Sequence, residues 1–374
     1  MPQLRELSLS HTARMEASPA AFRQLAAALT QLTALDVSFC PLLFNTEEEE
    51  AAAAAAAGEG PKGDLVMQMQ QLRSLKVCRT SSSLLDFAAI SQATALTHLA
   101  AGGDRDDDPG HWFTQTPDTQ HLPLMQRLRR LELSSCSFDS LAAAAVAKLT
   151  QLTSINYSNS IVSLGVIEAL GSCSGLIELN LCTLQSGFRG RAPGPAVAAA
   201  WAHLSLLTAL TMLNVSGRGC NANFSAGLLV PLARACGSRL RVLLLDACAK
   251  QPGELAVLLP ACTGLAALDL SHSGCRFSTD HLSALAGLSR LEWLQLQHCK
   301  PMLRGDAVAA LVQLRQLQQL DLRDNDLSLA GTRALLVALA GAGGQLTELR
   351  MGGNFDVTGR AKAQLAREFV HVAL

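Results

Sequence analysis

The stretch Leu-Gln-Gln-Leu-Asp-Leu-Arg-Asp-Asn at residues 317–325 decides the fold. Its leucines stand at positions one, four and six, and this apolar spacing recurs thirteen times along the chain, with 24 to 40 residues between successive copies. The opening residues of the copies are Leu4, Leu32, Leu72, Leu96, Leu128, Leu152, Leu176, Leu210, Leu240, Leu265, Leu291, Leu317 and Leu346. A short unit repeated at such intervals predicts a stacked array and not a closed globule.

Each copy has the pattern of a short strand followed by a helix. Apolar and polar residues alternate through the strand, so positions four and six face a core while positions three, five and seven face solvent. In the fifth copy this places Leu131 and Leu133 inside and Glu132 outside. Apolar residues then recur at helical spacing, as at Leu311 and Leu314. The repeating unit is therefore predicted to be one strand, a turn and one amphipathic helix.

A second pattern marks the turn after each strand. Position nine holds residues that can hydrogen-bond the turning backbone, namely Cys40, Cys136, Cys248, Cys299, Asn325 and Asn354, with Thr12, Thr80, Ser160 and Ser273 as polar substitutes. This pattern resembles the leucine-rich repeat family. The cysteine turns resemble the cysteine-containing subfamily of F-box receptors, and the last two copies resemble ribonuclease inhibitor. The resemblance implies an α/β fold, a leucine-rich repeat solenoid (horseshoe) of about 13 repeats with a parallel concave sheet and convex helices.

The predicted array spans residues 1–359, and residues 360–374 are predicted to form a C-terminal capping helix over the last strand. Three segments break the period and are predicted to leave the scaffold as loops, namely 46–64, 102–123 and 185–198. The second contains Trp112 and Phe113 beside several aspartates, a composition typical of a secondary interaction anchor. The alternative is that Trp112 folds back onto the convex surface.

The start of the chain is already a repeat strand, with Leu4, Leu7 and Leu9. An uncovered strand edge invites pairing, so we expect a missing N-terminal cap, a partner or self-association to cover this edge. No charged and then apolar leader precedes the strand, and we therefore expect a cytoplasmic protein. Eleven cysteines, an odd number at repeat positions, fit reduced structural thiols better than a disulfide framework.

Composition argues against several classes of function. Apolar residues make up 49% of the chain but aromatic residues only 4%, which predicts an aliphatic core. With 30 basic and 31 acidic residues and no run of Lys or Arg, we expect no nucleic-acid partner. No stretch approaches the roughly 18 to 20 apolar residues of a membrane span, so we expect no membrane partner.

No local motif predicts chemistry. The aspartates from Asp106 to Asp108 lack the alternating ligands of a calcium loop, and His111 and His121 are not spaced as on a zinc-binding helix. The chain also lacks a Gly-x-Ser-x-Gly elbow and the Gly-Lys-Ser/Thr ending of a phosphate loop. We therefore expect no catalytic residues, no metal and no cofactor. A triad assembled from distant residues remains open at this stage.

The outward strand positions line the concave face of such an array, and they divide it in two. In the first eight copies they are small and polar, as at Ser8 and Asn156. From the ninth copy on they gather charged groups around one tryptophan, the usual composition of a binding hot spot: Asp246, Asp269, His272, Trp293, Gln295, His298, Asp321, Arg323 and Arg350. The alternative is that outward positions are polar by default and Trp293 packs on its neighbours. His272 and His298 are expected to form a stacked pair roughly 5 Å apart.

The leading hypothesis is a non-enzymatic protein-protein interaction scaffold that binds its partner on the concave face. An alternative, implied by the resemblance of the cysteine turns, is substrate recognition in an SCF-type ubiquitin ligase, although three residues before Leu4 leave no room for an F-box. A third hypothesis is that the protein is a structural component of a large assembly such as the ciliary axoneme, because the chain resembles the algal-type Ala-rich repeat proteins that occur in axonemes.

Overall fold

The computed structural model of the chain consists of two compact units. Unit 1 comprises Met1–Leu176 with Gln185–Gly187, and unit 2 comprises Ile177–Leu184 and Phe188–Leu374. The residues that the structure describes are 3–11, 28–39, 70–78, 87–102, 119–183, 194–217, 225–248, 253–273, 283–299, 305–341 and 345–354.

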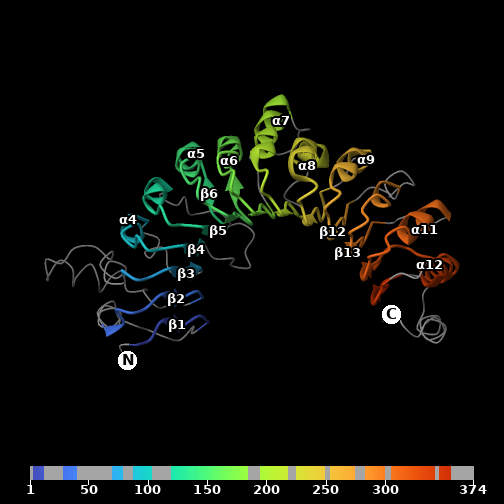
Figure 1. Cartoon of the computed structure of the whole chain (residues 1–374), viewed down its shortest axis with the longest axis horizontal. Helices are drawn as coiled ribbons and strands as arrows, with labels where there is room; N and C mark the ends of the chain where they lie inside the picture. Colours follow the sequence, from blue (N-terminus) through green and yellow to red (C-terminus); the bar gives the residue numbers. More distant parts are fainter. Residues whose placement is uncertain are drawn as a thin grey trace. The chain divides into compact units, whose positions relative to one another are not determined.

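Unit 1 is a stack of parallel strands with helical segments on one side of them (Figure 1). In its described part, each strand pairs with the next one along the chain: β1 (Glu6–Ser8), β2 (Ala34–Asp36), β3 (Ser74–Cys78), β4 (His98–Gly102), β5 (Arg130–Ser134) and β7 (Ser154–Asn156). A second, short pair joins β6 (Ser137–Phe138) to β8 (Ile161–Val162). The helical segments are α4 (Phe87–Ile90), η2 (Thr119–Leu124), α5 (Ser140–Val146) and α6 (Leu164–Leu170).

Unit 2 repeats this arrangement (Figure 1). Its described strands pair in parallel and in chain order: β9 (Glu178–Asn180), β10 (Met212–Asn214), β11 (Val242–Leu244), β12 (Ala267–Asp269), β13 (Trp293–Gln295), β14 (Gln319–Asp321) and β15 (Glu348–Arg350). Its helical segments are α7 (Pro195–Ala202), η3 (His203–Leu206), η4 (Ala226–Leu229), α8 (Val230–Cys236), α9 (Glu254–Leu258), η5 (Leu259–Ala261), α11 (Gly305–Val312) and α12 (Leu329–Gly341). In both units, equal positions of neighbouring copies pair, so residues with the same position number form rows across the strands.

The leucines at positions one, four and six form the core of each unit. Leu131 and Leu133 are buried, while Glu132 between them is half-exposed. In unit 2, Leu268 and Leu270 are likewise buried. The predicted alternation of inward and outward residues is therefore confirmed, and so is the predicted unit of a strand, a turn and a helix.

The residue at position nine holds each turn to the copy before it. The Asn325 side chain donates through Nδ2 to the Leu296 carbonyl and accepts through Oδ1 from the Cys299 amide, both at 2.7 Å. Ser160 links its turn to the preceding copy in the same way in unit 1. Its hydroxyl donates to the Leu133 carbonyl at 3.2 Å and accepts from the Cys136 amide at 3.1 Å. Both side chains are buried. The hydrogen-bonding role predicted for position nine is thus confirmed in both units.

Several predicted segments lie partly or wholly outside the described residues. The first predicted loop, 46–64, and the predicted capping helix, 360–374, lie outside entirely, as do Trp112 and Phe113. Of the other two predicted loops, the described ends are helical. Residues 119–123 belong to η2, and residues 195–198 begin α7, where Pro195 takes the first helical position that proline favours.

Candidate functional site

The nine residues predicted to bind a partner all belong to unit 2. The strand register places Asp269, Gln295, Asp321 and Arg350 in one row at position five, across β12 to β15. Trp293 lies one pleat earlier, at position three, in the row that continues to Gln319 and Glu348. The other four predicted residues follow the strands in the turns: Asp246, His272, His298 and Arg323.

Trp293 is half-buried and lines a small pocket on the strand face. The lining comes from three neighbouring strands and consists of Trp293, Leu294, Gln295, Gln319, Leu320, Asp321, Glu348 and Arg350. The pocket therefore combines one large aromatic ring with amide, carboxylate and guanidinium groups. An apolar side chain of a partner can therefore pack on the Trp293 ring while the polar groups around the ring form hydrogen bonds.

Two arginine–carboxylate pairs stiffen this surface. The Arg323 guanidinium donates to both oxygens of Asp321, with its Nη2 at 2.6 Å from Oδ2 and its Nε at 3.0 Å from Oδ1. Asp321 is almost fully buried, and this bond raises the pKa of Arg323 above its ordinary value. In the next copy, the Arg350 Nε donates to Glu348 Oε1 at 2.6 Å. The bidentate pair fixes the geometry of Arg323 and Asp321 before any partner arrives, whereas the Arg350–Glu348 pair is a single bond between two partly exposed side chains.

Position five also has a structural role that the sequence interpretation missed. Its Asp or Asn side chain accepts a hydrogen bond from the backbone amide two residues later, which closes the strand with an Asx turn. This bond is made in both units, by Asp36, Asn156, Asn180, Asn214, Asp269 and Asp321. Burial, the largest cause, raises the pKa of Asp269 above its ordinary value. The presence of Asp269 and Asp321 at position five is therefore accounted for in part by the Asx turn. Trp293 and Arg350 form no such turn and are the stronger candidates for partner binding.

His272 and His298 of unit 2 stack as predicted. The ring centroids of His272 and His298 lie 5.5 Å apart with 23° between the planes. His272 Nδ1 also lies 2.8 Å from Asp246 Oδ1. Both histidines stand at position eight on left-handed backbone, with φ of 53° and 55°, a conformation that recurs at this position in other copies. In the described parts of both units, no group of three or more potential metal ligands comes together.

A polar cluster in unit 1 was missed by the sequence interpretation. His98 Nε2 lies 3.0 Å from Glu132 Oε1, and His98 Nδ1 lies 3.3 Å from the Ser74 hydroxyl. The hydrogen bond from His98, the largest cause, lowers the pKa of Glu132. The prediction that the first eight copies carry only small polar residues is therefore wrong at positions three and five of β4 and β5. These are the same positions that identified the surface of unit 2, and the same inspection would have found the cluster.

The unit 1 cluster has the residue types of a catalytic triad but lacks its surroundings. The backbone amides of Ser74 and His98 donate to the carbonyls of Thr33 and Arg73 in the preceding strand. Those amides are therefore not available to stabilise an oxyanion, which acyl transfer requires. The cluster is better described as a polar patch on the strand surface.

Most of the described cysteines are buried. Burial raises the pKa of Cys173 and of Cys236 to about 11 and that of Cys262 to about 12. A thiol with such a pKa stays protonated near neutral pH and is a poor nucleophile. These cysteines fill space in the core.

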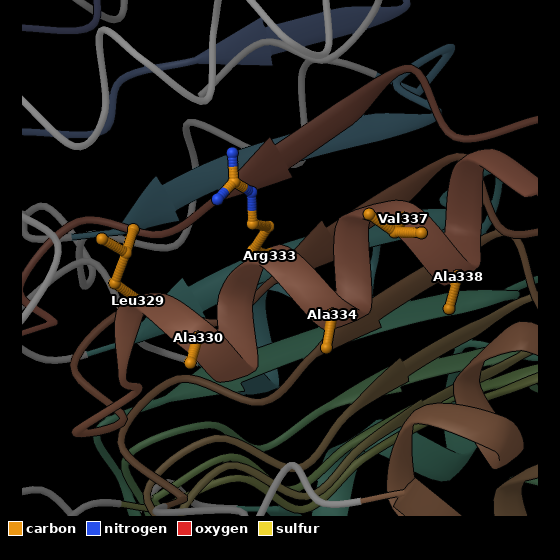
Figure 2. A pocket seen from close by; sticks show the side chains of 6 residues that line it. All are labelled: Leu329, Ala330, Arg333, Ala334, Val337 and Ala338. Atoms are coloured by element: carbon orange, nitrogen blue, oxygen red, sulfur yellow. The ribbon is translucent and has the colours of Figure 1, made fainter.

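A larger pocket lies on the outer surface of α12, away from the predicted residues (Figure 2). It is lined by Leu329, Ala330, Arg333, Ala334, Val337 and Ala338. Figure 2 shows Leu329, Arg333 and Val337 on one side of the helix and the three alanines on another. The lining is almost entirely apolar and offers no arrangement of catalytic groups.

Comparison with known proteins settles the fold. No family model matches the chain, and no curated protein matches its sequence. Among solved structures, an internalin (inlF) from Listeria monocytogenes str. 4b F2365 aligns with a TM-score of 0.50 and 14% identity, over 79% of this chain and 75% of that one. TLR13 in its complex with ssRNA13 aligns with a TM-score of 0.55 and 16% identity, over 100% of this chain and 50% of that one. The fold is a leucine-rich repeat solenoid.

These likenesses establish the α/β solenoid and no more, since the identities are low. This chain spans half the length of the TLR13 chain. The expectation that nucleic acid is not a partner gains no support here, because the TLR13 structure is a complex with ssRNA13. Within the described residues, no helix is long and apolar enough to cross a membrane.

Proposed function

We propose that this leucine-rich repeat protein is a non-enzymatic scaffold that binds a protein partner through the strand face of unit 2. The observation that carries the proposal is Trp293, a half-buried tryptophan beside Asp321, whose carboxylate is already held by Arg323. Tryptophan and arginine are the residues most enriched at the energetic centres of protein interfaces. The contact we propose is centred on Trp293, Gln295 and Arg350.

Side chains that are already fixed in the free protein lower the free-energy cost of binding. Binding costs free energy whenever flexible side chains become fixed, about 0.5 to 1.5 kcal/mol for each one. The bidentate Asp321–Arg323 pair holds both of its side chains before a partner arrives, and the single bond between Arg350 and Glu348 restricts Arg350 to a lesser degree. The cost is therefore lower here than on a surface of solvated, unpaired charges.

The contents of the pockets support a binding function over a catalytic one. The lining of the Trp293 pocket contains no histidine, cysteine, serine or lysine, and neither does the lining of the α12 pocket. A nucleophile and a base within hydrogen-bonding reach of each other are the minimum for covalent catalysis. The two carboxylates of the Trp293 pocket, Asp321 and Glu348, are each bonded to an arginine and not to each other, and the α12 pocket contains no carboxylate.

The test compares partners recovered by quantitative affinity purification with the intact chain and with Trp293→Ala and Arg350→Glu. We expect each substitution to lower recovery of the specific partners at least tenfold, the scale of a hot-spot residue. Val337→Ala removes an exposed apolar side chain from α12, and Arg315→Glu reverses an exposed charge off the strand face. These two controls should leave recovery unchanged. An unchanged partner list with Trp293→Ala would remove the site assignment.

Two narrower functions are kept as proposals. Cysteine turns such as that of Cys299, whose Sγ bonds the Leu270 carbonyl at 3.0 Å, favour the cysteine-containing subfamily and with it substrate recognition in an SCF-type ubiquitin ligase. Recovery of a cullin adaptor with the full-length gene product would support that role, and its absence would count against it. A structural role in the ciliary axoneme would be supported by co-sedimentation with detergent-extracted cilia. The two ribonuclease-inhibitor-like turns, at Asn325 and Asn354, favour protein binding in general.

A further inference from the structure

A row of arginines forms at the edge of unit 1 where its strands begin. Position two, which precedes each strand, alternates between arginine and threonine through the first six copies: Arg5, Thr33, Arg73, Thr97, Arg129 and Thr153. The register of β1 to β5 and β7 places these residues in one row. The arginines are up to 124 residues apart along the chain, from Arg5 to Arg129, so no run of basic residues shows in the sequence.

The threonines and arginines of this row have different roles. The Thr33 hydroxyl donates to the Arg5 carbonyl at 3.0 Å, and the Thr97 hydroxyl donates to the Arg73 carbonyl at 3.0 Å. The Thr153 hydroxyl donates in the same way to the Arg129 carbonyl, at 3.1 Å. Each threonine therefore ties its copy to the backbone of the copy before it. Folding explains the threonines, but these bonds use none of the arginine side chains.

The arginine side chains are exposed and carry unbalanced charge. Arg5, Arg73 and Arg129 are all exposed, and so is Arg127, two residues before Arg129. The Arg129 Nη1 donates to the Gln151 carbonyl of the next copy at 2.8 Å, which holds its guanidinium along the edge. Among the described residues of unit 1, no carboxylate forms an ion pair with Arg73, Arg127 or Arg129. The edge is thus a positive strip on a chain whose net charge is −1.

We propose that this arginine edge of unit 1 binds an acidic, extended segment of a partner protein. The arginines stand on alternate strands, and two strand steps measure about 10 Å. A peptide in the extended polyproline II conformation rises about 9 Å in each turn of three residues, so every third side chain points the same way. A segment with a carboxylate at every third residue, crossing the strands from β1 to β5, can therefore meet Arg5, Arg73 and Arg129 in turn. Each guanidinium can grip a carboxylate through two parallel hydrogen bonds.

An acidic peptide fits this edge better than a nucleic acid. Proteins that hold single strands combine basic grooves with aromatic side chains on which the bases stack. In the described part of unit 1, Phe87, Phe138 and Tyr157 are buried in the core. Phe39 stands in the turn after β2, at the opposite end of the strand, where it stacks on His11. Within the described residues of unit 1, the edge therefore offers arginines to a polyanion but no aromatic side chain on which bases could stack.

The test measures binding of a labelled seven-residue peptide, Glu-Gly-Ser-Glu-Gly-Ser-Glu, to the full chain by fluorescence anisotropy. We expect Arg73→Glu with Arg129→Glu to weaken binding at least tenfold. The matched control, Arg290→Glu, reverses an exposed arginine of unit 2 and should change nothing. The double variant loses the Arg129–Gln151 bond but keeps the threonine bonds along the edge, which Thr33, Thr97 and Thr153 make to backbone carbonyls. An unchanged thermal unfolding curve checks that the fold is kept.

Two comparison probes make the result specific. A peptide of the same composition with its three glutamates adjacent should bind several-fold more weakly, because only the spaced carboxylates match the alternate strands. A uridine heptamer should also bind more weakly at equal salt. No peptide binding, or equal binding by the double variant, overturns the inference, and tighter binding of the uridine heptamer overturns it in favour of nucleic acid.

This inference rests on the proposed protein-binding function but concerns a different unit. Trp293→Ala should leave peptide binding at the edge unchanged. A failure of the Trp293 assignment and a failure of the edge assignment therefore give different results and cannot be confused.

Discussion

Units 1 and 2 have cores built on the same pattern and differ at their outward positions. In the described part of each unit, apolar residues are buried at positions one, four and six, and a buried polar or thiol side chain stands at position nine. Unit 1 presents arginines ahead of its strands and a His98–Glu132 pair on them. Unit 2 instead presents Trp293 beside ion-paired carboxylates. The comparison teaches that the repeat sets the scaffold while a few unburied positions set what each unit can bind.

If the two cores are equivalent, replacing the leucine at the same position of either unit by alanine should lower the free energy of unfolding by the same amount. Leu131 of unit 1 and Leu268 of unit 2 both stand at position four and are fully buried. We expect Leu131→Ala and Leu268→Ala each to lower the free energy of unfolding by about 3 kcal/mol, from lost burial and the cavity left behind. Urea denaturation followed by circular dichroism measures both. A difference larger than about 1 kcal/mol would show that the two cores are not equivalent.

The turns allow an exchange between the units. Asn325→Ala leaves the Leu296 carbonyl and the Cys299 amide buried without their partner, which should cost about 2 kcal/mol of unfolding free energy. Asn325→Ser copies the turn of Ser160, whose hydroxyl makes both kinds of bond in unit 1. We expect serine to recover about half of the loss. If serine is no better than alanine in the same denaturation experiment, the turns of the two units are not interchangeable.

The sequence predicted the scaffold well because burial follows directly from leucine spacing. The strand alternation around Leu131 and the turn role of Asn325 both depend on positions within one copy. The start of α12 likewise depends on residues close together in the chain, because the Ser328 hydroxyl accepts a hydrogen bond from the Gly331 amide at 3.1 Å. Such features depend on neighbours only a few residues away, and a single copy is enough to show them.

The surfaces were predicted less completely because they depend on register between copies. The partner of Glu132 is His98, which lies 34 residues earlier, and the arginine edge joins residues still farther apart. Asp269 was taken for a binding residue, but its carboxylate also closes a strand by accepting from the Ser271 amide at 2.9 Å. An outward polar residue can serve folding, binding or both. Only the contacts around it distinguish these roles.

Among the described residues, two buried hydroxyls find no hydrogen-bond partner. One belongs to Tyr157 in unit 1, whose ring packs at a tilt against Phe138 with 4.5 Å between ring centroids, and the other belongs to Thr332 in unit 2. Burial raises the pKa of Tyr157 well above its ordinary range. We expect Tyr157→Phe and Thr332→Val each to raise the free energy of unfolding by about 1 kcal/mol, because the desolvation cost of the hydroxyl disappears. A loss of stability in either variant would mean that its hydroxyl has a partner in solution.

The smallest expected effect is a pH dependence of stability that has opposite signs at one carboxylate of unit 1, Glu132, and one of unit 2, Asp269. The hydrogen bond with His98 is the main cause that lowers the pKa of Glu132 from its ordinary 4.5. The ionised Glu132 carboxylate therefore stabilises the fold fully above pH 4.5, and this contribution is lost as the pH falls through the folded-state pKa. The pKa of Asp269 is raised from 3.8 by burial, so its charge destabilises the fold near neutral pH, and that penalty is relieved as the pH falls through the raised pKa. Glu132→Gln should therefore lower, and Asp269→Asn should raise, the free energy of unfolding at neutral pH, each by less than about 1 kcal/mol.

These two variants should differ from the wild type in opposite directions, and both differences should disappear in acid. Asn can still accept the Ser271 amide bond, so Asp269→Asn removes the charge and keeps the Asx turn, whereas Glu132→Gln weakens a charge-assisted bond. Glu292→Gln, at an exposed position, serves as the control and should follow the wild type throughout. Urea denaturation at about pH 7, 5 and 3.5 measures all three. Differences of the same sign for Glu132→Gln and Asp269→Asn would mean that burial, and not the partner, decides how both carboxylates act.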